Sequence, residues 1–139
     1  MLTIANSLLE LIRAHASDAY PNECSGLIVG VYDKRVAKKV FPMKNVHAGG
    51  THNRYLIDPK EYIEVEKQAQ LLGQGVIGAY HSHPDVPAEP SATDLALATW
   101  PEYVYVIVSV VKGKADHVRA WTLRDDRSGF DEVELRVVE

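Results

Sequence analysis

Two histidines separated by one residue, His81 and His83, are the strongest chemical feature of the chain. They directly follow the apolar run Val76–Tyr80, which predicts a strand. On a strand, residues i and i+2 point to the same side, so both imidazoles can reach one metal ion. A polar pair at the surface of a sheet is the alternative interpretation of the same pattern.

Asp94 is a carboxylate that can complete such a site. It follows His83 across a proline-rich loop and lies in the first turn of a predicted helix, Ala92 to about Trp100. Two histidines, one carboxylate and a water molecule are a common ligand set of catalytic zinc. Ser91 and Asp94 also fit a capping box, in which both side chains satisfy free backbone donors at a helix start.

Glu23 and Cys24 precede a second apolar run, Gly26–Tyr32, which predicts a buried strand. Glu23 can serve as a general base, or it can be an exposed carboxylate in a turn. Cys24 lacks a nearby histidine partner in the sequence, which favours an inert thiol over a nucleophile.

Taken together, these residues resemble the JAMM signature of the MPN-domain metalloproteases. That signature combines a glutamate at the head of a strand, a His-x-His-Pro motif, a spacer and a Ser-x-x-Asp motif. Ser25 departs from the bacterial branch, which often has cysteine before the glycine, but this is not a metal position. The matching segments are Glu23, His81–Pro84 and Ser91–Asp94, with further similarity in Pro21–Gly30, Ile57–Pro59, Gly78–Tyr80 and Ile107–Ser109.

The resemblance implies a specific division of roles. His81, His83 and Asp94 would bind one zinc ion per chain, Glu23 would act as general base and acid, and Ser91 would stabilise the oxyanion. The expected reaction is hydrolysis of a peptide or isopeptide bond after the C-terminal Gly-Gly tail of a ubiquitin-like sulfur-carrier protein. A non-catalytic MPN scaffold and a phage-tail-type peptidase with another substrate are the alternatives.

The elements expected around these residues indicate an α/β (α+β) fold, a mixed central sheet flanked by about three helices. The MPN resemblance implies the same architecture, similar to the cytidine-deaminase fold. A deaminase itself is excluded, because its signature needs a Pro-Cys-x-x-Cys motif and the chain has one cysteine. The expected helices are one carrying Ile4, Leu8, Leu11 and Ile12, one from Asp58 to Gly73, and one from Ala92; further strands are Arg35–Phe41, Tyr55–Ile57, Tyr103–Val111, His117–Leu123 and Glu132–Val138.

Length and composition set the frame for these assignments. The 139 residues suit a single domain spanning residues 1–139, and a net charge of −4 makes nucleic acid a poor partner. The most apolar stretch, Tyr103–Val111, is too short to span a bilayer, and the start lacks a secretion signal. With its single cysteine, the protein is expected in the cytoplasm, without a membrane partner. The loop Val46–Arg54 is a candidate wall of the substrate groove, and the oligomeric state stays open.

Overall fold

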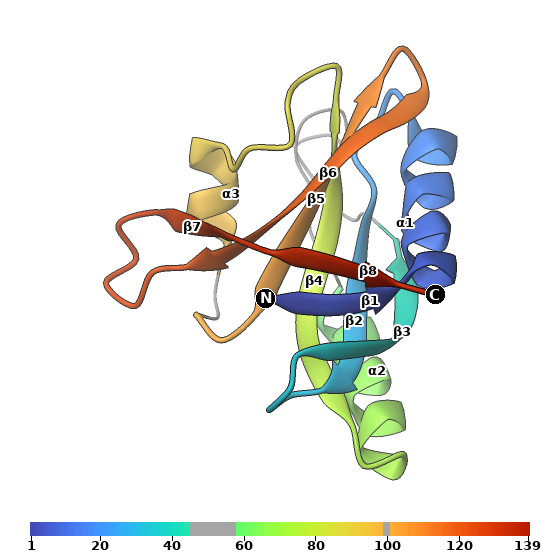
Figure 1. Cartoon of the computed structure of the whole chain (residues 1–139), viewed down its shortest axis with the longest axis vertical. Coiled ribbons are helices and arrows are strands. Elements are labelled where there is room, and N and C mark those ends of the chain that lie inside the picture. Colours follow the sequence, from blue (N-terminus) through green and yellow to red (C-terminus); the bar gives the residue numbers. More distant parts are fainter. Residues whose placement is uncertain (45–57, 99–100) are drawn as a thin grey trace.

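The computed structural model describes residues 1–44, 58–98 and 101–139. Within these residues, three helices flank one mixed sheet (Figure 1), which confirms the expected fold class. The elements in chain order are β1 Leu2–Ala5, α1 Asn6–Ala19, β2 Ser25–Val31, β3 Val36–Met43, α2 Pro59–Leu71, β4 Gly75–Pro84, α3 Ala92–Leu97, β5 Val104–Val111, β6 Lys114–Leu123, β7 Phe130–Val133 and β8 Leu135–Val138.

The strand order across the sheet is β7-β6-β5-β4-β2-β3-β1-β8. Strand β4 lies near the middle, antiparallel to β2 and parallel to β5. The pairs β1–β3 and β1–β8 are also parallel, and the remaining pairs are antiparallel. The strand that carries the two histidines is therefore hydrogen-bonded on both sides.

The two faces of the sheet bury two separate hydrophobic clusters. Because side chains alternate along a strand, Ile28 of β2 packs in the cluster that contains Ile12 of α1. Its neighbour Leu27 packs in the other cluster, with Val65 of α2, and Leu95 of α3 packs against that same cluster. Helix α1 thus covers one face, and α2 and α3 cover the other.

The same alternation along β4 decides which face carries the histidines. Ala79 packs on the α2/α3 face, whereas Tyr80 packs on the α1 face. Continuing with period two places His81 and His83 on the α2/α3 face. Strand β4 extends to Pro84, so both histidines are strand residues rather than the start of a loop.

Two glycines allow the strands around the histidines to pack closely. A side chain at Gly26 of β2 would collide with the ring of Tyr80. One at Gly78 of β4 would collide with the backbone carbonyl of Val104 on β5. Both positions therefore need hydrogen in place of a Cβ atom.

The predicted start of the first helix is wrong. Ile4 was expected on the helical stripe, but it lies in β1 and pairs in register with Val137 of β8. Helix α1 begins at Asn6 and buries Leu9, Ile12 and Ala16. Pairing with a strand at the far end of the chain overrides the local helical spacing. A pattern of neighbouring residues cannot reveal such a long-range pairing.

The predicted strand Glu132–Val138 is two strands. Strand β7 pairs with β6, whereas β8 pairs with β1 on the opposite edge of the sheet. Helix α3 ends at Leu97, earlier than expected. The loop Val46–Arg54 and the strand Tyr55–Ile57 lie outside the described residues.

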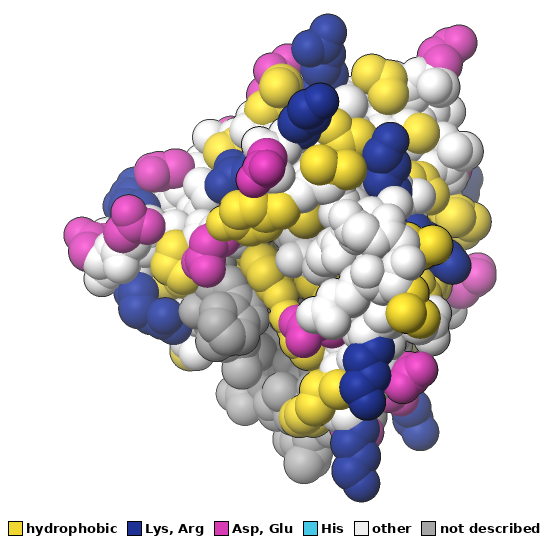
Figure 2. Space-filling model, turned by 90° about the horizontal axis from the view of Figure 1, so that it is seen from below, with side chains coloured by type: hydrophobic (Ala, Val, Ile, Leu, Met, Phe, Trp, Pro, Cys, Tyr) yellow, Lys and Arg dark blue, Asp and Glu magenta, His cyan; other side chains and the backbone are white. Residues whose placement is uncertain are grey.

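Within the described ranges, no helix is long and apolar enough to cross a membrane. On the face shown in Figure 2, Lys and Arg side chains lie among Asp and Glu side chains rather than in one block. Hydrophobic side chains are scattered between them. This view matches the mixed, mildly acidic composition of the chain.

Candidate metal centre

Four buried polar side chains converge at one point, two from β4, one from α3 and one from the segment before β2. Glu23, His81, His83 and Asp94 each offer a ligand atom, and these atoms lie within 4.8 Å of one another. Each residue is 6% exposed or less. The Nε2 atoms of the two histidines are 3.2 Å apart, and each lies within 3.0 Å of a different Asp94 oxygen.

The pairing of β2 with β4 brings Glu23 to this point. Ser25 pairs in register with His81, and the Cys24 amide donates to the Ser82 hydroxyl at 2.8 Å. The Ser82 amide in turn donates to the Cys24 carbonyl at 3.2 Å. These contacts continue the ladder past the end of β2 and hold the preceding residue, Glu23, next to the histidines.

The start of α3 supplies Asp94. The Asp94 amide donates to Ser91 Oγ at 3.0 Å, and the Ser91 amide donates to Asp94 Oδ2 at 2.8 Å, forming a complete capping box. The capping interpretation of the Ser-x-x-Asp motif is therefore confirmed. The same Oδ2 atom lies 2.9 Å from His83 Nε2, so one carboxylate both caps the helix and forms part of the site.

His83 is oriented by a backbone carbonyl. Its Nδ1 lies 2.9 Å from the oxygen of Pro87. A carbonyl can only accept, so Nδ1 carries the proton and donates. This hydrogen bond turns Nε2 toward His81 and Asp94, the arrangement in which a histidine presents a nitrogen to a metal.

Burial and the charges of neighbouring groups shift the pKa values of three residues in the cluster. Burial raises the pKa of Glu23 to about 8, with His83 opposing the shift and Asp94 adding to it. Burial also disfavours charge on Asp94, but His81 and the hydrogen bonds outweigh it and hold the pKa of Asp94 well below its usual range. His83 is likewise desolvated, yet its contacts with Asp94 raise its pKa.

The donor set fits a zinc ion. Tetrahedral zinc with ligand bonds of about 2.0–2.1 Å places its ligand atoms about 3.3 Å apart. The three separations among the histidine nitrogens and the Asp94 oxygens, 2.9, 3.0 and 3.2 Å, are close to that spacing. Two imidazoles and one carboxylate leave the fourth position for water or substrate, which is the pattern of a catalytic site.

Cys24 lies beside the cluster without taking part in it. The thiol is buried, and burial raises its pKa to about 11. A protonated, inaccessible thiol is a poor nucleophile. The structure therefore favours the inert interpretation of Cys24.

Sequence reasoning missed the partners that hold the loop between His83 and Ser91. Neither the Pro87 carbonyl nor His117, which accepts from the Ala88 amide at 3.0 Å, was singled out for a role. One signal was available. Pro84, Pro87 and Pro90 lack amide protons, so the loop has few backbone donors of its own to fix it.

Comparison with known proteins places this geometry in a family. The family described as prokaryotic homologs of the JAB domain matches residues 5–124. The desampylase of Haloferax volcanii is 36% identical over 104 residues, which cover 75% of this chain and 74% of that protein. The CysO-cysteine peptidase of Mycobacterium tuberculosis is 30% identical over 139 residues, covering 100% of this chain and 92% of that protein.

Solved structures agree with this assignment. A solution structure of a protein from Desulfitobacterium hafniense superposes with a TM-score of 0.86 at 32% identity, covering 100% of this chain and 94% of the other. A structure described as a JAMM metalloprotease-like zinc site in the proteasome and signalosome superposes with a TM-score of 0.62 at 26% identity. It covers 100% of this chain and 99% of the other.

The fold and the four-residue cluster define the class of JAMM metalloproteases. The chain belongs to the family of prokaryotic homologs of the JAB domain. The prediction of a hydrolase of the peptidase type is confirmed by these relatives.

Proposed function

We propose that this protein is a zinc peptidase that cleaves conjugates of a ubiquitin-like sulfur-carrier protein. The scissile bond is the peptide or isopeptide bond that follows the carrier's C-terminal Gly-Gly tail. The observation that carries the proposal is the convergence of four buried ligand atoms within 4.8 Å. Relatives named desampylase, TtuB-protein conjugate cleaving protease and CysO-cysteine peptidase support the choice of substrate.

In this proposal His81, His83 and Asp94 hold the metal ion. When bound there, a zinc ion would lower the pKa of a bound water to about 7 and would polarise the substrate carbonyl. Asp94 stays ionised, since its pKa lies well below its usual range, and it would balance part of the charge of the metal. The Pro87 carbonyl keeps the proton of His83 on Nδ1, so that Nε2 is free to bind.

Glu23 is the proposed general base and acid. Its burial, at 5% exposed, and its raised pKa of about 8 suit a carboxylate that accepts a proton and later releases it near neutral pH. It lies just before β2, in a part of the chain separate from the three proposed ligands. Glu23 can therefore take a proton from the nucleophilic water and deliver it to the leaving amine.

Ser91 is the proposed donor to the oxyanion. Its hydroxyl accepts from the Asp94 amide, which leaves its own proton available to donate. A well-placed donor of this kind is worth roughly 3–4 kcal/mol in the transition state. The backbone hydrogen bond of the capping box holds the hydroxyl in position without using that proton.

The expected setting of the enzyme is the cytoplasm, as a single domain. The single cysteine cannot form an intrachain disulfide, which fits a reducing compartment. The proposed partner is the carrier-protein conjugate, and neither nucleic acid nor membrane is part of the proposal.

The testing experiment uses a sulfur-carrier protein extended by a short peptide beyond its Gly-Gly end. The protein and its Glu23→Gln variant are incubated with this substrate, and intact mass is followed over time. We expect a mass loss equal to the extension with the wild-type protein and none with the variant. Equal cleavage by both would remove Glu23 as the base, and binding without cleavage by either would favour the non-catalytic scaffold.

A further inference from the structure

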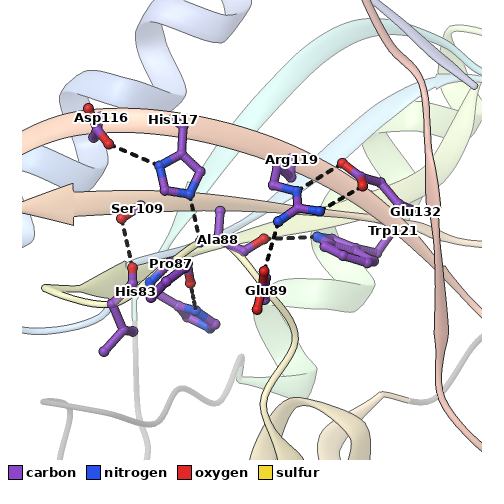
Figure 3. Close-up of polar contacts among 11 residues, drawn as sticks. His83, Pro87, Ala88, Glu89, Ser109, Asp116, His117, Arg119, Trp121 and Glu132 are labelled. Atoms are coloured by element: carbon purple, nitrogen blue, oxygen red, sulfur yellow. Dashed lines mark hydrogen bonds and ion pairs between the residues drawn. The ribbon is translucent and has the colours of Figure 1, made fainter.

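The loop between the two histidines and Asp94 is hydrogen-bonded to β6, a strand that carries none of the four cluster residues. This loop, Asp85–Pro90, connects His83 to the start of α3. Its Ala88 is fully buried, and the loop carries two prolines, Pro87 and Pro90. Figure 3 shows side chains of β5 and β6 reaching over to it.

Side chains of β6 form hydrogen bonds with both backbone polar groups of Ala88. His117 Nε2 accepts from the Ala88 amide at 3.0 Å, and Trp121 Nε1 donates to the Ala88 carbonyl at 3.0 Å (Figure 3). We call these two hydrogen bonds the Ala88 clamp. A buried amide and carbonyl must be paired, and the clamp pairs both groups of Ala88. The preceding residue, Pro87, has no amide proton to contribute.

The geometry of the sheet explains why β6 can reach the loop. Val118 and Ala120 of β6 pack on the α1 face, so the alternate residues His117 and Trp121 point to the α2/α3 face. This is the face that carries His81 and His83. Strand β5 lies between β4 and β6, and its Ser109 donates to the Val86 carbonyl of the same loop at 2.7 Å.

The carbonyl that orients His83 is adjacent to the clamped residue. The Pro87 oxygen accepts from His83 Nδ1, and Pro87 and Ala88 share one planar peptide unit. Fixing the Ala88 amide therefore fixes the orientation of the Pro87 carbonyl, because both belong to that plane. Any rotation of this peptide would move the acceptor away from His83.

The tautomer of His117 is itself defined by its neighbour. Asp116 Oδ2 lies 3.0 Å from His117 Nδ1 and accepts its proton, which leaves Nε2 as the acceptor for Ala88. Arg119 adds a contact from the same strand, binding Glu89 of the loop at 3.1 Å and Glu132 of β7 at 2.7 Å. The loop is thus tied to β6 at two consecutive residues.

We propose that His117 and Trp121 are positioning residues of the metal centre, which act through the Pro87 carbonyl to hold His83 in its ligand orientation. The inference rests on the proposed metal-binding role of His81, His83 and Asp94. Groups that orient a metal-binding histidine typically contribute 10- to 100-fold to metal affinity or activity. The Ala88 clamp acts on His83 through the Pro87–Ala88 peptide, and its loss should therefore also lower metal affinity.

The test measures metal affinity rather than turnover. Zinc affinity is determined by competition with a chelator, and the visible absorption of the cobalt-substituted protein reports ligand geometry. His117→Ala removes the acceptor, and Trp121→Phe removes the donor while retaining an aromatic ring. We expect each to weaken zinc binding by about 10-fold or more and to change the cobalt spectrum.

Two matched variants separate positioning from general stability. His117→Gln retains an acceptor near the position of Nε2 and should restore affinity to within about threefold of wild type, less than the smallest effect expected of an orienting group. Val118→Ala loosens the same strand on its opposite face and should leave both the affinity and the spectrum unchanged. If Val118→Ala weakens binding as much as His117→Ala does, the effect is one of stability and the proposal is wrong.

His81→Ala serves as the reference for the site itself. Loss of zinc in His81→Ala together with wild-type affinity in His117→Ala and Trp121→Phe would overturn the clamp and leave the metal centre intact. Unchanged zinc binding in His81→Ala would overturn the proposed metal centre and the clamp with it.

Discussion

Two histidines on the same face of the sheet, His83 and His117, each lie at nearly the same distance from an aspartate. His83 Nε2 is 2.9 Å from Asp94, and His117 Nδ1 is 3.0 Å from Asp116. Their side chains differ in exposure, at 6% and 7% for the first pair and 43% and 63% for the second. The same residue types at the same distance therefore sit in very different dielectric surroundings.

Burial changes what each pair can do. In the buried pair a charge is costly unless a partner or metal compensates it. Its contacts with the histidines hold the pKa of Asp94 well below its usual range. In the exposed pair water screens the charges, and the interaction mainly selects a tautomer. The buried pair is proposed to bind a metal ion, whereas the exposed pair is proposed to orient a backbone amide.

The largest expected effect is a loss of zinc affinity when a proposed ligand of the buried cluster is removed. His81→Ala should reduce zinc affinity by several orders of magnitude, because only two of the three proposed ligands remain. Metal content after dialysis and chelator competition would measure it. His15→Ala, at a histidine outside the cluster, is the control and should retain the full metal content. Retention of zinc in His81→Ala would remove that residue from the ligand set.

Ser91→Ala should lower kcat by about 10²–10³-fold, the typical cost of losing one oxyanion donor. The same change removes the helix cap and should cost about 1 kcal/mol of unfolding free energy. Turnover per folded molecule and the melting temperature measure the two effects separately. A clear loss of stability with unchanged turnover would show that Ser91 acts as a cap alone. Ser91→Asp keeps a capping acceptor and is the matched control for stability.

Glu23→Gln should stabilise the metal-free protein at pH 8 but not at pH 4.5. The folded-state pKa of Glu23 is raised from 4.5 to about 8, so the folded state binds more protons than the unfolded state between these values. Wild-type stability therefore falls as pH rises through this window, and glutamine removes that fall. Melting temperatures of the metal-free proteins, several degrees apart at pH 8, would show it. Parallel pH profiles of wild type and variant would contradict it.

The smallest effect is expected at the exposed pair. Asp116→Asn should change the unfolding free energy by less than about 1 kcal/mol, as is typical of exposed ion pairs. The asparagine oxygen can still accept from His117 Nδ1, so the Ala88 clamp should survive. Denaturant unfolding is the measurement, with Asp94→Asn in the buried pair as the contrasting variant. A larger loss at Asp116 than at Asp94 would reverse the comparison.

Local patterns predicted the parts of the site that depend on neighbours in sequence. The His-x-His spacing indicated one face of a strand, and Ser-x-x-Asp indicated a capping box, because periods of two residues and one helical turn are intrinsic to those elements. The mixed sheet with three helices was also predicted correctly. The first strand was missed, since residues 2–5 pair with a strand at the other end of the chain.

Convergence at the metal centre depended on tertiary structure. Glu23 joins the histidines because Ser25 pairs in register with His81, and strand register is a long-range property. The family resemblance, rather than local physics, linked Glu23 to the cluster at the level of sequence. His117 and Trp121 gave no signal of their own, because their partner is the backbone of Ala88, which no side-chain pattern reveals.

By itself, the sequence determined which chemical groups are present, their faces on β4 and the capped start of α3. These follow from backbone geometry over a few residues. The tertiary structure decided which groups meet, how deeply they are buried and which carbonyl orients His83. Those properties arise when distant strands pair and exclude water, because burial sets both the cost of a charge and the value of its partner.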